Sequence, residues 1–389
     1  MHIVVAGPLN LPQLADFLSP SDGDRALQES TGNGTAPGLI VREYLKRGHR
    51  VTVVTYRQGE AEAEFTGPNL RVRRIDFSRP MWQRALGRWS AEIGEVESAI
   101  RDAGADVVHS QWPYEAALAA ARSGVPHLAT IRDAPLTVVK SYRSPMRVIR
   151  ATIAYDFRLR SGKSRLSVVS PYLRDAWRHQ MFDRREIDII PNIVPLDMTA
   201  RESLATRPTI LEVSDSGTRK NVRKLILAFR QVRSVIPDAE LRLVGRGLDA
   251  SSEIAEWAAQ HGVANGVVFR GPLERDRIRA EYSRAWVHAH ASREETFGNT
   301  LVEAMAAGTA VVGGRDSGAV PWVLDHGAAG ELVDVEDVGS FGAALVDLLS
   351  DHDRRAVLAA AGRASARARF GSDSVAASYE EVLEGLAQR

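Results

Sequence analysis

The chain has 389 residues, a formal net charge of +1, 44% hydrophobic and 25% charged residues, and no cysteine. The composition is that of an ordinary globular protein, and the length favours two domains. It excludes disulfides and thiolate chemistry, and the balanced charge argues against nucleic acid as a partner. No apolar run approaches the roughly 18 residues of a membrane span, and the N-terminus lacks a signal-peptide pattern, so we expect a cytoplasmic or peripheral protein.

Short apolar runs alternate with amphipathic helical stretches along the whole chain, which predicts parallel α/β units. In the first half we expect strands over 2–6, 51–55, 107–109, 127–131 and 166–169. In the second half we expect them over 209–213, 240–244, 267–270, 287–291, 310–313 and 330–333. The sequence therefore predicts an α/β fold with two Rossmann-like domains, whose ligand loops share a cleft if the domains face each other.

The domain boundary is expected where Pro191, Pro195 and Pro208 interrupt the periodicity. We place the domains at 1–198 and 199–371. A last amphipathic helix is expected within 372–389 and should pack back on the first domain. Its apolar residues at helical spacing are Val375, Tyr379, Val382, Leu383 and Leu386.

Residues 140–165 break the charge balance, because eight basic residues face one acid, Asp156, and eight minus one is +7. The basic residues are Lys140, Arg143, Arg147, Arg150, Arg158, Arg160, Lys163 and Arg165. Such a run is usually a solvated helix face. It can also dock on an anionic membrane surface or an anionic acceptor.

Two carboxylates flank a predicted strand-to-helix turn. Glu295 lies on the loop after the strand 287–291, and Glu303 lies in the first turn of the next helix. Between them, Phe297, Gly298, Asn299 and Thr300 form a turn whose backbone amides and helix dipole suit a diphosphate. A capping box between Thr300 and Glu303 would explain Glu303 without a ligand.

A second loop carries two cations. Arg219 and Lys220 follow the strand 209–213, and Asn221 is a plausible N-cap of the next helix. At this place the cations can neutralise a departing diphosphate. Taken alone, a basic pair on a loop is more often surface charge.

No group of side chains has convincing metal-ligand spacing. His288 and His290 lie two apart on a strand and are interpreted as packing residues. We expect no metal and no cofactor. His109 and Gln111, at the end of another strand, are candidates for acceptor contacts, with a hydrogen-bonded buried histidine as the equally weighted alternative.

The motifs resemble one known family. The Glu-x7-Glu pattern at Glu295 and Glu303 is similar to that of family 4 of the retaining glycosyltransferases, which have the GT-B architecture. Further matches are Ile-Pro-Asn at 190–192, Gly-His-x-Val-Thr-Val at 48–53, Lys-Asn at 220–221 and the run from Leu225 to Gly247. The likeness covers nearly the whole chain.

The resemblance implies a metal-independent, retaining transfer of a hexosyl-type group from a nucleotide-diphosphate sugar to an acceptor hydroxyl. The first domain would bind the acceptor and the second the donor. Glu295 would contact the donor sugar, Glu303 the ribose, and Lys220 the diphosphate. Arg219 would replace an arginine that the family has at the position of Ser214 or Asp215.

Three other places depart from the family pattern. Arg132 and Asp133 stand where the family has His-Asp on the acceptor side, and Trp322 follows Pro321 where it often has Pro-Glu. Gly34 closes the segment 32–34, which stands for the Gly-Gly of the first loop. Loops near Arg270 are expected to meet the base, without indicating which base.

Three rival interpretations were weighed. A dinucleotide-dependent oxidoreductase is disfavoured because Gly245 and Gly247 are not followed by the third glycine of its fingerprint. A sugar-nucleotide epimerase would share the fold but need no acceptor. A non-catalytic nucleotide-sugar-binding module is suggested by Ser214, Arg132 and Trp322, which stand where the family usually has other residues. The donor sugar and base stay open, as does the acceptor, which could be a lipid-linked saccharide, a polysaccharide or a small metabolite.

Overall fold

The computed structural model describes residues 1–29, 34–57, 59–142, 144–194 and 204–388. The contacts divide the chain into two compact units. The N-terminal unit comprises Met1–Ile193 and Ser372–Arg389, and the C-terminal unit comprises Val194–Gly371. The boundary expected between 198 and 199 lies outside the described residues, whereas the expected start of the last helix, 372, coincides with the second division.

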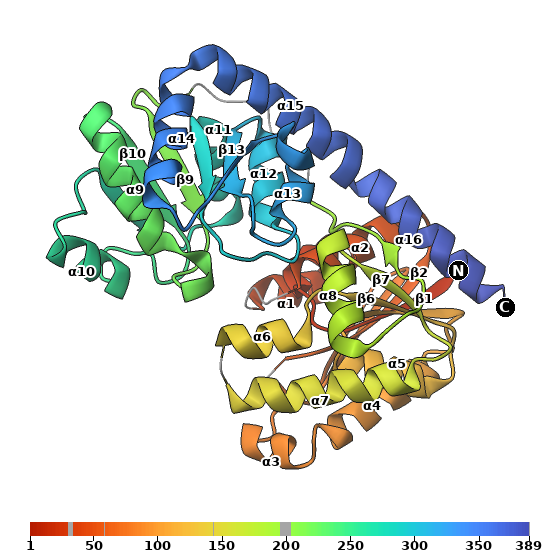
Figure 1. Cartoon of the computed structure of the whole chain (residues 1–389). Helices are drawn as coiled ribbons and strands as arrows, with labels where there is room; N and C mark the ends of the chain where they lie inside the picture. Colours follow the sequence, from red (N-terminus) through yellow and green to blue (C-terminus); the bar gives the residue numbers. More distant parts are fainter. Residues whose placement is uncertain (30–33, 58, 143, 195–203, 389) are drawn as a thin grey trace. The chain divides into compact units, whose positions relative to one another are not determined.

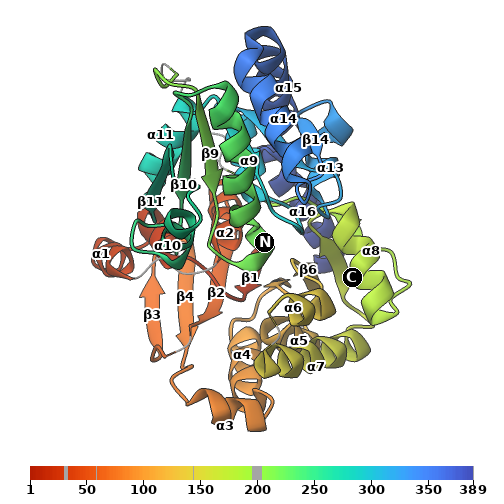
Figure 2. The same ribbon diagram turned by 60° about the vertical axis from the view of Figure 1, so that its left-hand side comes forward.

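The N-terminal unit is built on an eight-stranded sheet in the order β3-β4-β2-β1-β5-β6-β7-β8. All neighbours pair in parallel except β3, which runs antiparallel to β4 at the edge. Figure 2 shows β3, β4, β2 and β1 side by side. The strands are β1 (His2–Ala6), β2 (Arg50–Tyr56), β3 (Ala63–Thr66), β4 (Leu70–Ile75), β5 (Val107–Gln111), β6 (His127–Ile131), β7 (Arg165–Val168) and β8 (Asp188–Ile189).

Helices cover both faces of this sheet (Figure 1). They are η1 (Leu11–Phe17), α1 (Pro20–Gln28), α2 (Thr35–Lys46), α3 (Met81–Leu86), α4 (Ser90–Asp102), α5 (Glu115–Ser123), α6 (Pro135–Tyr142), α7 (Pro145–Arg160), α8 (Pro171–Met181) and α16 (Ser372–Ala387). One hydrophobic core joins η1, α2 and α16 to β1, β2 and β4. Tyr379 and Leu383 of α16 are fully buried in it, so the end of the chain is part of the N-terminal unit.

The C-terminal unit is built on a parallel six-stranded sheet in the order β11-β10-β9-β12-β13-β14. Numbered from its first strand this order is 3-2-1-4-5-6, that of the doubly wound dinucleotide-binding fold. The strands are β9 (Thr209–Val213), β10 (Glu240–Val244), β11 (Val267–Gly271), β12 (Val287–His290), β13 (Ala310–Gly314) and β14 (Glu331–Val333).

Two layers of helices enclose this second sheet (Figure 1). They are η2 (Thr218–Lys220), α9 (Val222–Val235), α10 (Glu253–Gln260), α11 (Arg275–Arg284), α12 (Asn299–Ala307), α13 (Val320–Val323), η3 (Asp325–Gly327), α14 (Val338–Ser350) and α15 (His352–Phe370). The apolar faces of α9 and α14 form the main core with β9, β10 and β12. The prediction of two parallel α/β domains is therefore confirmed.

Every strand expected from the sequence is present to within two residues at either end, and three strands were missed. β4 carries Arg71, Arg73 and Arg74 among its apolar residues because it lies next to the sheet edge, where one face is solvated. β3 is four residues long and β8 only two, which is too short for a periodic signal.

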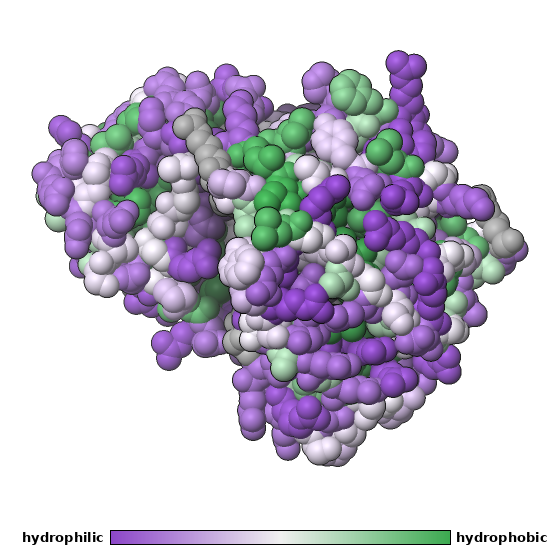
Figure 3. All heavy atoms as spheres, turned by 90° about the horizontal axis from the view of Figure 1, so that it is seen from below, coloured by the Kyte–Doolittle hydropathy of each residue, from purple (hydrophilic) through white to green (hydrophobic). Residues whose placement is uncertain are grey.

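Hydrophilic residues predominate on the face shown in Figure 3, and hydrophobic ones gather there in small groups. Among the helices of the described ranges, none combines the length and the hydropathy required to cross a bilayer.

Candidate active site

Each sheet has one topological switch point, where the chain leaves neighbouring strands in opposite directions. In the C-terminal unit it lies between β9 and β12, and in the N-terminal unit between β1 and β5. Loops at the carboxyl ends of such strands form the usual ligand site of an open α/β sheet. The residues predicted from the sequence follow these four strands or their neighbours, so each unit is considered separately.

The loop after β9 is held rigidly beside the loop after β12. The Arg293 amide donates to the Arg219 carbonyl over 2.9 Å, and the Arg293 guanidinium donates to the Thr218 carbonyl over 2.5 Å. A Cβ at Gly245, at the end of β10, would come within 1.7 Å of the Ser214 carbonyl oxygen. The backbones of three strand-end loops thus pack directly on one another.

Glu295 is the centre of the charged group in this unit. Lys220 Nζ lies 2.5 Å from Glu295 Oε1, and Arg219 Nη1 lies 3.2 Å from Glu295 Oε2. The Glu295 backbone is anchored as well, because its carbonyl accepts from the Ala319 amide over 2.9 Å. The structure therefore brings together the first carboxylate and both cations that the sequence singled out.

The charge state of Glu295 follows from these contacts. Burial opposes ionisation, yet Lys220, His290 and Arg219 together hold the pKa of the Glu295 carboxyl well below its usual range. Glu295 is consequently an anion at neutral pH, held between two cations at the strand ends.

Gly298 and the start of α12 form the predicted turn. Gly298 has a φ of 96°, and a Cβ there would lie 2.8 Å from Leu301 Cδ1, so a side chain is strained at this position. The helix begins at Asn299 with Gly298 as its N-cap residue. Thr300 is thus already inside the helix, and its hydroxyl lies 3.3 Å from His290 Nδ1. A capping box between Thr300 and Glu303 does not form.

Glu303 has its own partners. Its Oε2 accepts from the Tyr282 hydroxyl over 3.1 Å. Burial raises the pKa of the Glu303 carboxyl, although Tyr282, Arg275 and Arg279 oppose the shift. A carboxylate that keeps a hydrogen-bonded orientation in this way is suited to accept from a hydroxyl group of a ligand.

Two other residues predicted to bind the donor are engaged within the unit. Phe297 is 2% exposed and packs edge-on against Phe370, with ring centroids 5.3 Å apart, and against Trp322 at 6.3 Å. These are the contacts of a packing residue, which holds the loop on which Glu295 lies. Arg270 Nη2 is 3.0 Å from Glu281 Oε1, although the side chain is 46% exposed.

The prediction that Asn221 caps α9 with its side chain is corrected. Asn221 precedes α9, but its backbone is left-handed, with a φ of 58°, and its side chain makes no capping hydrogen bond. Its amide group instead donates to the Val335 carbonyl over 3.1 Å. The residue thereby ties η2 to the loop after β14.

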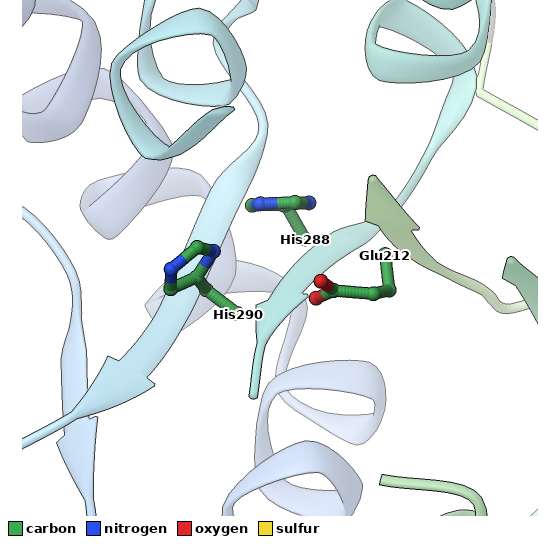
Figure 4. A group of neighbouring side chains, drawn as sticks. All are labelled: Glu212, His288 and His290. Atoms are coloured by element: carbon green, nitrogen blue, oxygen red, sulfur yellow. The ribbon is translucent and has the colours of Figure 1, made fainter. Parts of the chain in front are cut away.

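Sequence reasoning missed Glu212, which meets His288 and His290 behind Glu295 (Figure 4). Pairing between β9 and β12 joins only Ile210 with Val287 and Leu211 with His288. Glu212 therefore lies where the ladder ends. The available signal was a glutamate inside the otherwise apolar strand 209–213, which demands a partner that spacing alone cannot name.

In the N-terminal unit, the residues predicted to contact an acceptor lie in the core. His109 is fully buried, with Nδ1 2.9 Å from the Tyr44 hydroxyl and Nε2 2.7 Å from Thr130 Oγ1. Burial, with a contribution from Arg132, holds the pKa of His109 well below its usual range. The alternative of a hydrogen-bonded buried histidine describes it better than an acceptor contact.

Gln111 and Arg132 belong to the same buried layer. Gln111 Oε1 accepts from Arg132 Nε over 2.9 Å and from Arg132 Nη2 over 2.7 Å, and Arg132 Nη1 donates to the Asn192 side chain. Arg132 is 6% exposed, and Gln111 is 1% exposed. Arg132 therefore joins strand ends inside the unit, and its place on the acceptor side stays a prediction.

Asp133 and Gly34 stand closer to what was expected. Asp133 Oδ1 accepts from the Tyr114 hydroxyl over 2.9 Å, and burial raises the pKa of Asp133 to about 6. Gly34 is the N-cap of α2 with a φ of 115°, and a Cβ there would lie 2.6 Å from the Pro8 carbonyl oxygen. Its loop can approach the strand ends closely only because it has no side chain. Residues 32 and 33 lie outside the described residues.

Part of the charge of the basic segment 140–165 is compensated by acids from other elements. The segment comprises the end of α6, all of α7 and the start of β7, and Arg143 lies outside the described residues. Four of its cations are in ion pairs, which are Arg150 with Glu115, Arg158 with Asp183, Arg160 with Asp156 and Arg165 with Asp188. Asp156 is already counted in the formal +7, so the three acids from other elements reduce it to +4, which supports the interpretation as a solvated face only in part.

Comparison with known families gives two adjacent matches. Residues 197–365 match the family model described as Glycosyl transferases group 1, and residues 39–198 match that described as Glycosyltransferase Family 4. The two matches meet between the units and together cover most of the chain.

Two similar proteins differ in how much of the chain they match. A D-inositol 3-phosphate glycosyltransferase of Xylanimonas cellulosilytica is 30% identical over 401 residues, covering 93% of this chain and 94% of the relative. A GDP-mannose-dependent alpha-(1-6)-phosphatidylinositol monomannoside mannosyltransferase of Mycobacterium tuberculosis is 29% identical over 246 residues. That match covers 59% of this chain and 63% of the relative, so the chain spans less than two thirds of its length.

Solved structures share the fold at low sequence identity. Sucrose-phosphate synthase from Thermosynechococcus elongatus has a TM-score of 0.78 at 19% identity, covering 99% of both chains. Anabaena Alr3699/HepE, solved in complex with UDP, has a TM-score of 0.71 at 17% identity, covering 99% of this chain and 100% of the other. The fold is that of the GT-B glycosyltransferases.

Proposed function

The chain belongs to the family 4 glycosyltransferases, and from this premise we propose that it moves a hexosyl-type group from a nucleotide-diphosphate sugar to an acceptor hydroxyl, with retention of anomeric configuration. The observation that carries the proposal is the convergence of Lys220 and Arg219 on Glu295 at the switch point of the C-terminal sheet. The acceptor is proposed to be a glycan or glycolipid hydroxyl, the class that the relatives' names suggest.

The donor's diphosphate is proposed to bind between η2 and the start of α12. Arg219 and Lys220 supply positive charge from one side, and the amide end of a nine-residue helix supplies a dipole from the other. Glu295 keeps both cations in place before the donor arrives. Such preorganised charge stabilises a leaving group without reorganisation during the reaction.

Recognition of the rest of the donor is assigned to the carboxylates. Glu295 would accept from hydroxyl groups of the sugar, and Glu303, held by Tyr282, from those of the ribose. Asn299 and Thr300 lie in the first turn of α12 and would contact phosphate oxygens, while Arg270 would lie near the base.

The proposed chemical step is a front-face displacement. The bond between the anomeric carbon and the phosphate oxygen breaks, the acceptor oxygen bonds to the same face of that carbon, and the acceptor proton passes to the leaving phosphate oxygen. The step requires no enzyme nucleophile. Its charge is balanced by Arg219 and Lys220, so we propose that no Mg²⁺ or Mn²⁺ is needed at the diphosphate.

A donor panel tests the proposal directly. The purified chain is incubated with individual nucleotide-diphosphate sugars, with and without a mixture of inositol, glycan and glycolipid acceptors. We expect nucleoside diphosphate to be released above the hydrolysis background only when donor and acceptor are both present, at a rate unchanged by added Mg²⁺ or Mn²⁺. Nuclear magnetic resonance of the product should show the donor's anomeric configuration.

Two other outcomes would contradict the transfer. An altered nucleotide sugar formed without acceptor would identify an epimerase. Tight binding of nucleoside diphosphates with no turnover on any acceptor would identify a binding module. Glu256→Gln, an exposed change on α10, serves as the matched control for every carboxylate variant of the site.

A further inference from the structure

The cluster of Glu212, His288 and His290 stands apart from the residues assigned to the donor. All three side chains are fully buried. One carboxylate oxygen of Glu212 and one ring nitrogen from each histidine lie within 4.8 Å of one another. Figure 4 shows the carboxylate and the two imidazoles gathered beside the ends of β9 and β12.

The cluster contains polar atoms that the protein itself leaves without partners. Both carboxylate oxygens of Glu212, His288 Nε2, His290 Nε2 and Ser292 Oγ are buried and make no well-aligned hydrogen bond. Burial raises the pKa of the Glu212 carboxyl, although His290, Ser214 and the Ala291 amide oppose the shift. Buried polar atoms without partners destabilise a fold, so the cluster calls for an occupant.

The outer contacts of the two imidazoles are those of metal ligands. His288 Nδ1 lies 3.0 Å from the Leu211 carbonyl oxygen, which places the proton on Nδ1 and a lone pair on Nε2. His290 Nδ1 lies 3.3 Å from the Thr300 hydroxyl, which leaves Nε2, 3.4 Å from Glu295 Oε1, as the nitrogen for the metal. Histidines that bind metals usually direct the other ring nitrogen at a hydrogen-bond partner, as His288 does at the Leu211 carbonyl.

We propose that Glu212, His288 and His290 bind a Zn²⁺ ion behind Glu295. Two imidazoles and one carboxylate are a donor set that zinc accepts, and the chain has no cysteine to compete for it. Ligand atoms about 2.1 Å from a tetrahedral zinc ion are about 3.4 Å from one another. The three ligand atoms lie within 4.8 Å of one another, so their separations would shorten by roughly 1 Å on binding. Ser292 Oγ or a water completes the coordination.

Charge is compatible with this ion. Zinc adds positive charge to that of Arg219 and Lys220, and the negative charges of a bound diphosphate can balance the group. The ion would lie beside His290, whose Nε2 is 3.4 Å from Glu295 Oε1. It acts as a positioning element, which distinguishes it from a metal that binds phosphate.

Metal content of the full chain tests the site. The protein is produced in zinc-supplemented medium, dialysed against metal-free buffer and analysed by inductively coupled plasma mass spectrometry. We expect about one zinc ion per chain in the wild type and at least about a tenfold loss in Glu212→Gln and in His288→Gln. Glu92→Gln and His127→Gln serve as matched controls, because both residues are buried in the N-terminal unit. These variants should contain as much zinc as the wild type.

A second measurement covers variants that do not fold. Co²⁺ added to metal-free wild-type chain should produce the visible absorption of a tetrahedral site with nitrogen and oxygen ligands, and added Zn²⁺ should abolish it and raise the melting temperature. A wild type that contains no zinc and shows neither effect overturns the proposal, since water then fills the cluster. So does undiminished zinc in folded Glu212→Gln and His288→Gln. Because zinc is counted on the protein, its absence and a failure of sugar transfer are separate results.

Discussion

The two units place polar side chains at the switch point of the same kind of sheet, but they use them differently. In the N-terminal unit His109, Gln111 and Arg132 bind one another and their neighbours, and among their buried polar atoms only Gln111 Nε2 is without a partner. In the C-terminal unit Glu295 holds two cations, and the adjacent cluster leaves five buried polar atoms unpaired. A closed network stabilises a core, whereas an incomplete one indicates a ligand.

Strand order shows where a ligand site can lie, and the hydrogen bonds of the buried polar groups show whether a ligand is needed there. Both switch points lie at the carboxyl ends of parallel strands, so strand order alone favours neither. The hydrogen-bond partners of the buried polar atoms distinguish the switch point of the C-terminal unit from that of the N-terminal unit. The predictions below test this separation, beginning with the largest expected effect.

Breaking the charged group of the C-terminal unit should have the largest effect. We expect Lys220→Ala and Glu295→Gln each to reduce transferase turnover at least about a hundredfold, because Lys220 supplies positive charge at the leaving group and Glu295 holds both cations in place. Steady-state kinetics with the donor found active, and circular dichroism to confirm the fold, provide the measurement. If Lys220→Ala retains the turnover of the Glu256→Gln control, Lys220 has no part in the reaction.

The opposite result is expected for the N-terminal network. Arg132→Met removes the donors to Gln111 and Asn192 and leaves their oxygens buried, so we expect a loss of about 2 kcal/mol in the free energy of unfolding. Urea denaturation followed by fluorescence measures it. At urea concentrations where the variant is still folded, its KM for the donor should stay within about twofold of the wild-type value. If Arg132→Met is as stable as the wild type but has no transferase activity, Arg132 contacts the acceptor and its role is not structural.

Asp133 should make the free energy of unfolding depend on pH. Folding raises its pKa to about 6, so the native state holds the proton more firmly than the unfolded state, and stability from this group falls as pH rises from about 4 to about 6. Asp133→Asn removes this loss. Because Asp133 is partly exposed, we expect the variant to gain only about 1 kcal/mol over the wild type at pH 7.5.

The control for this prediction is the same pair of proteins at pH 4. There the gain from Asp133→Asn should shrink toward zero, since at pH 4 native Asp133 is protonated and the unfolded carboxyl is only about half ionised. Thermal denaturation at the two pH values measures the difference. A gain that does not depend on pH would show that the carboxyl group keeps an ordinary pKa.

The smallest effect concerns the segment 140–165. Lys140 and Lys163 are exposed, while four of the arginines are bound to acids. If the segment docks on a membrane, Lys140→Glu with Lys163→Glu should weaken sedimentation with anionic vesicles, because each lysine contributes about 1 kcal/mol near such a surface. Equal sedimentation of wild type and variant would leave the segment as a solvated helix face.

The sequence by itself determined the class of fold, the family and the charged loops of the C-terminal unit. Apolar strands alternate with amphipathic helices, and this periodicity is local, so the bounds of most strands could be predicted closely. Glu295, Arg219 and Lys220 were found because they follow predicted strands and match a family pattern. The strand β4, next to the sheet edge, was not predicted because its exposed positions are charged.

Only the tertiary structure decided which polar residues are partners. His109 and Gln111 lie within β5 and Glu295 in the loop after β12, and burial among Tyr44, Thr130 and Arg132 is what engages the first two inside their unit. Glu212 is 76 residues from His288 in the sequence, and the strand order β9-β12 brings them together. Spacing along a chain says nothing about such pairs, because the sheet sets which distant strands become neighbours.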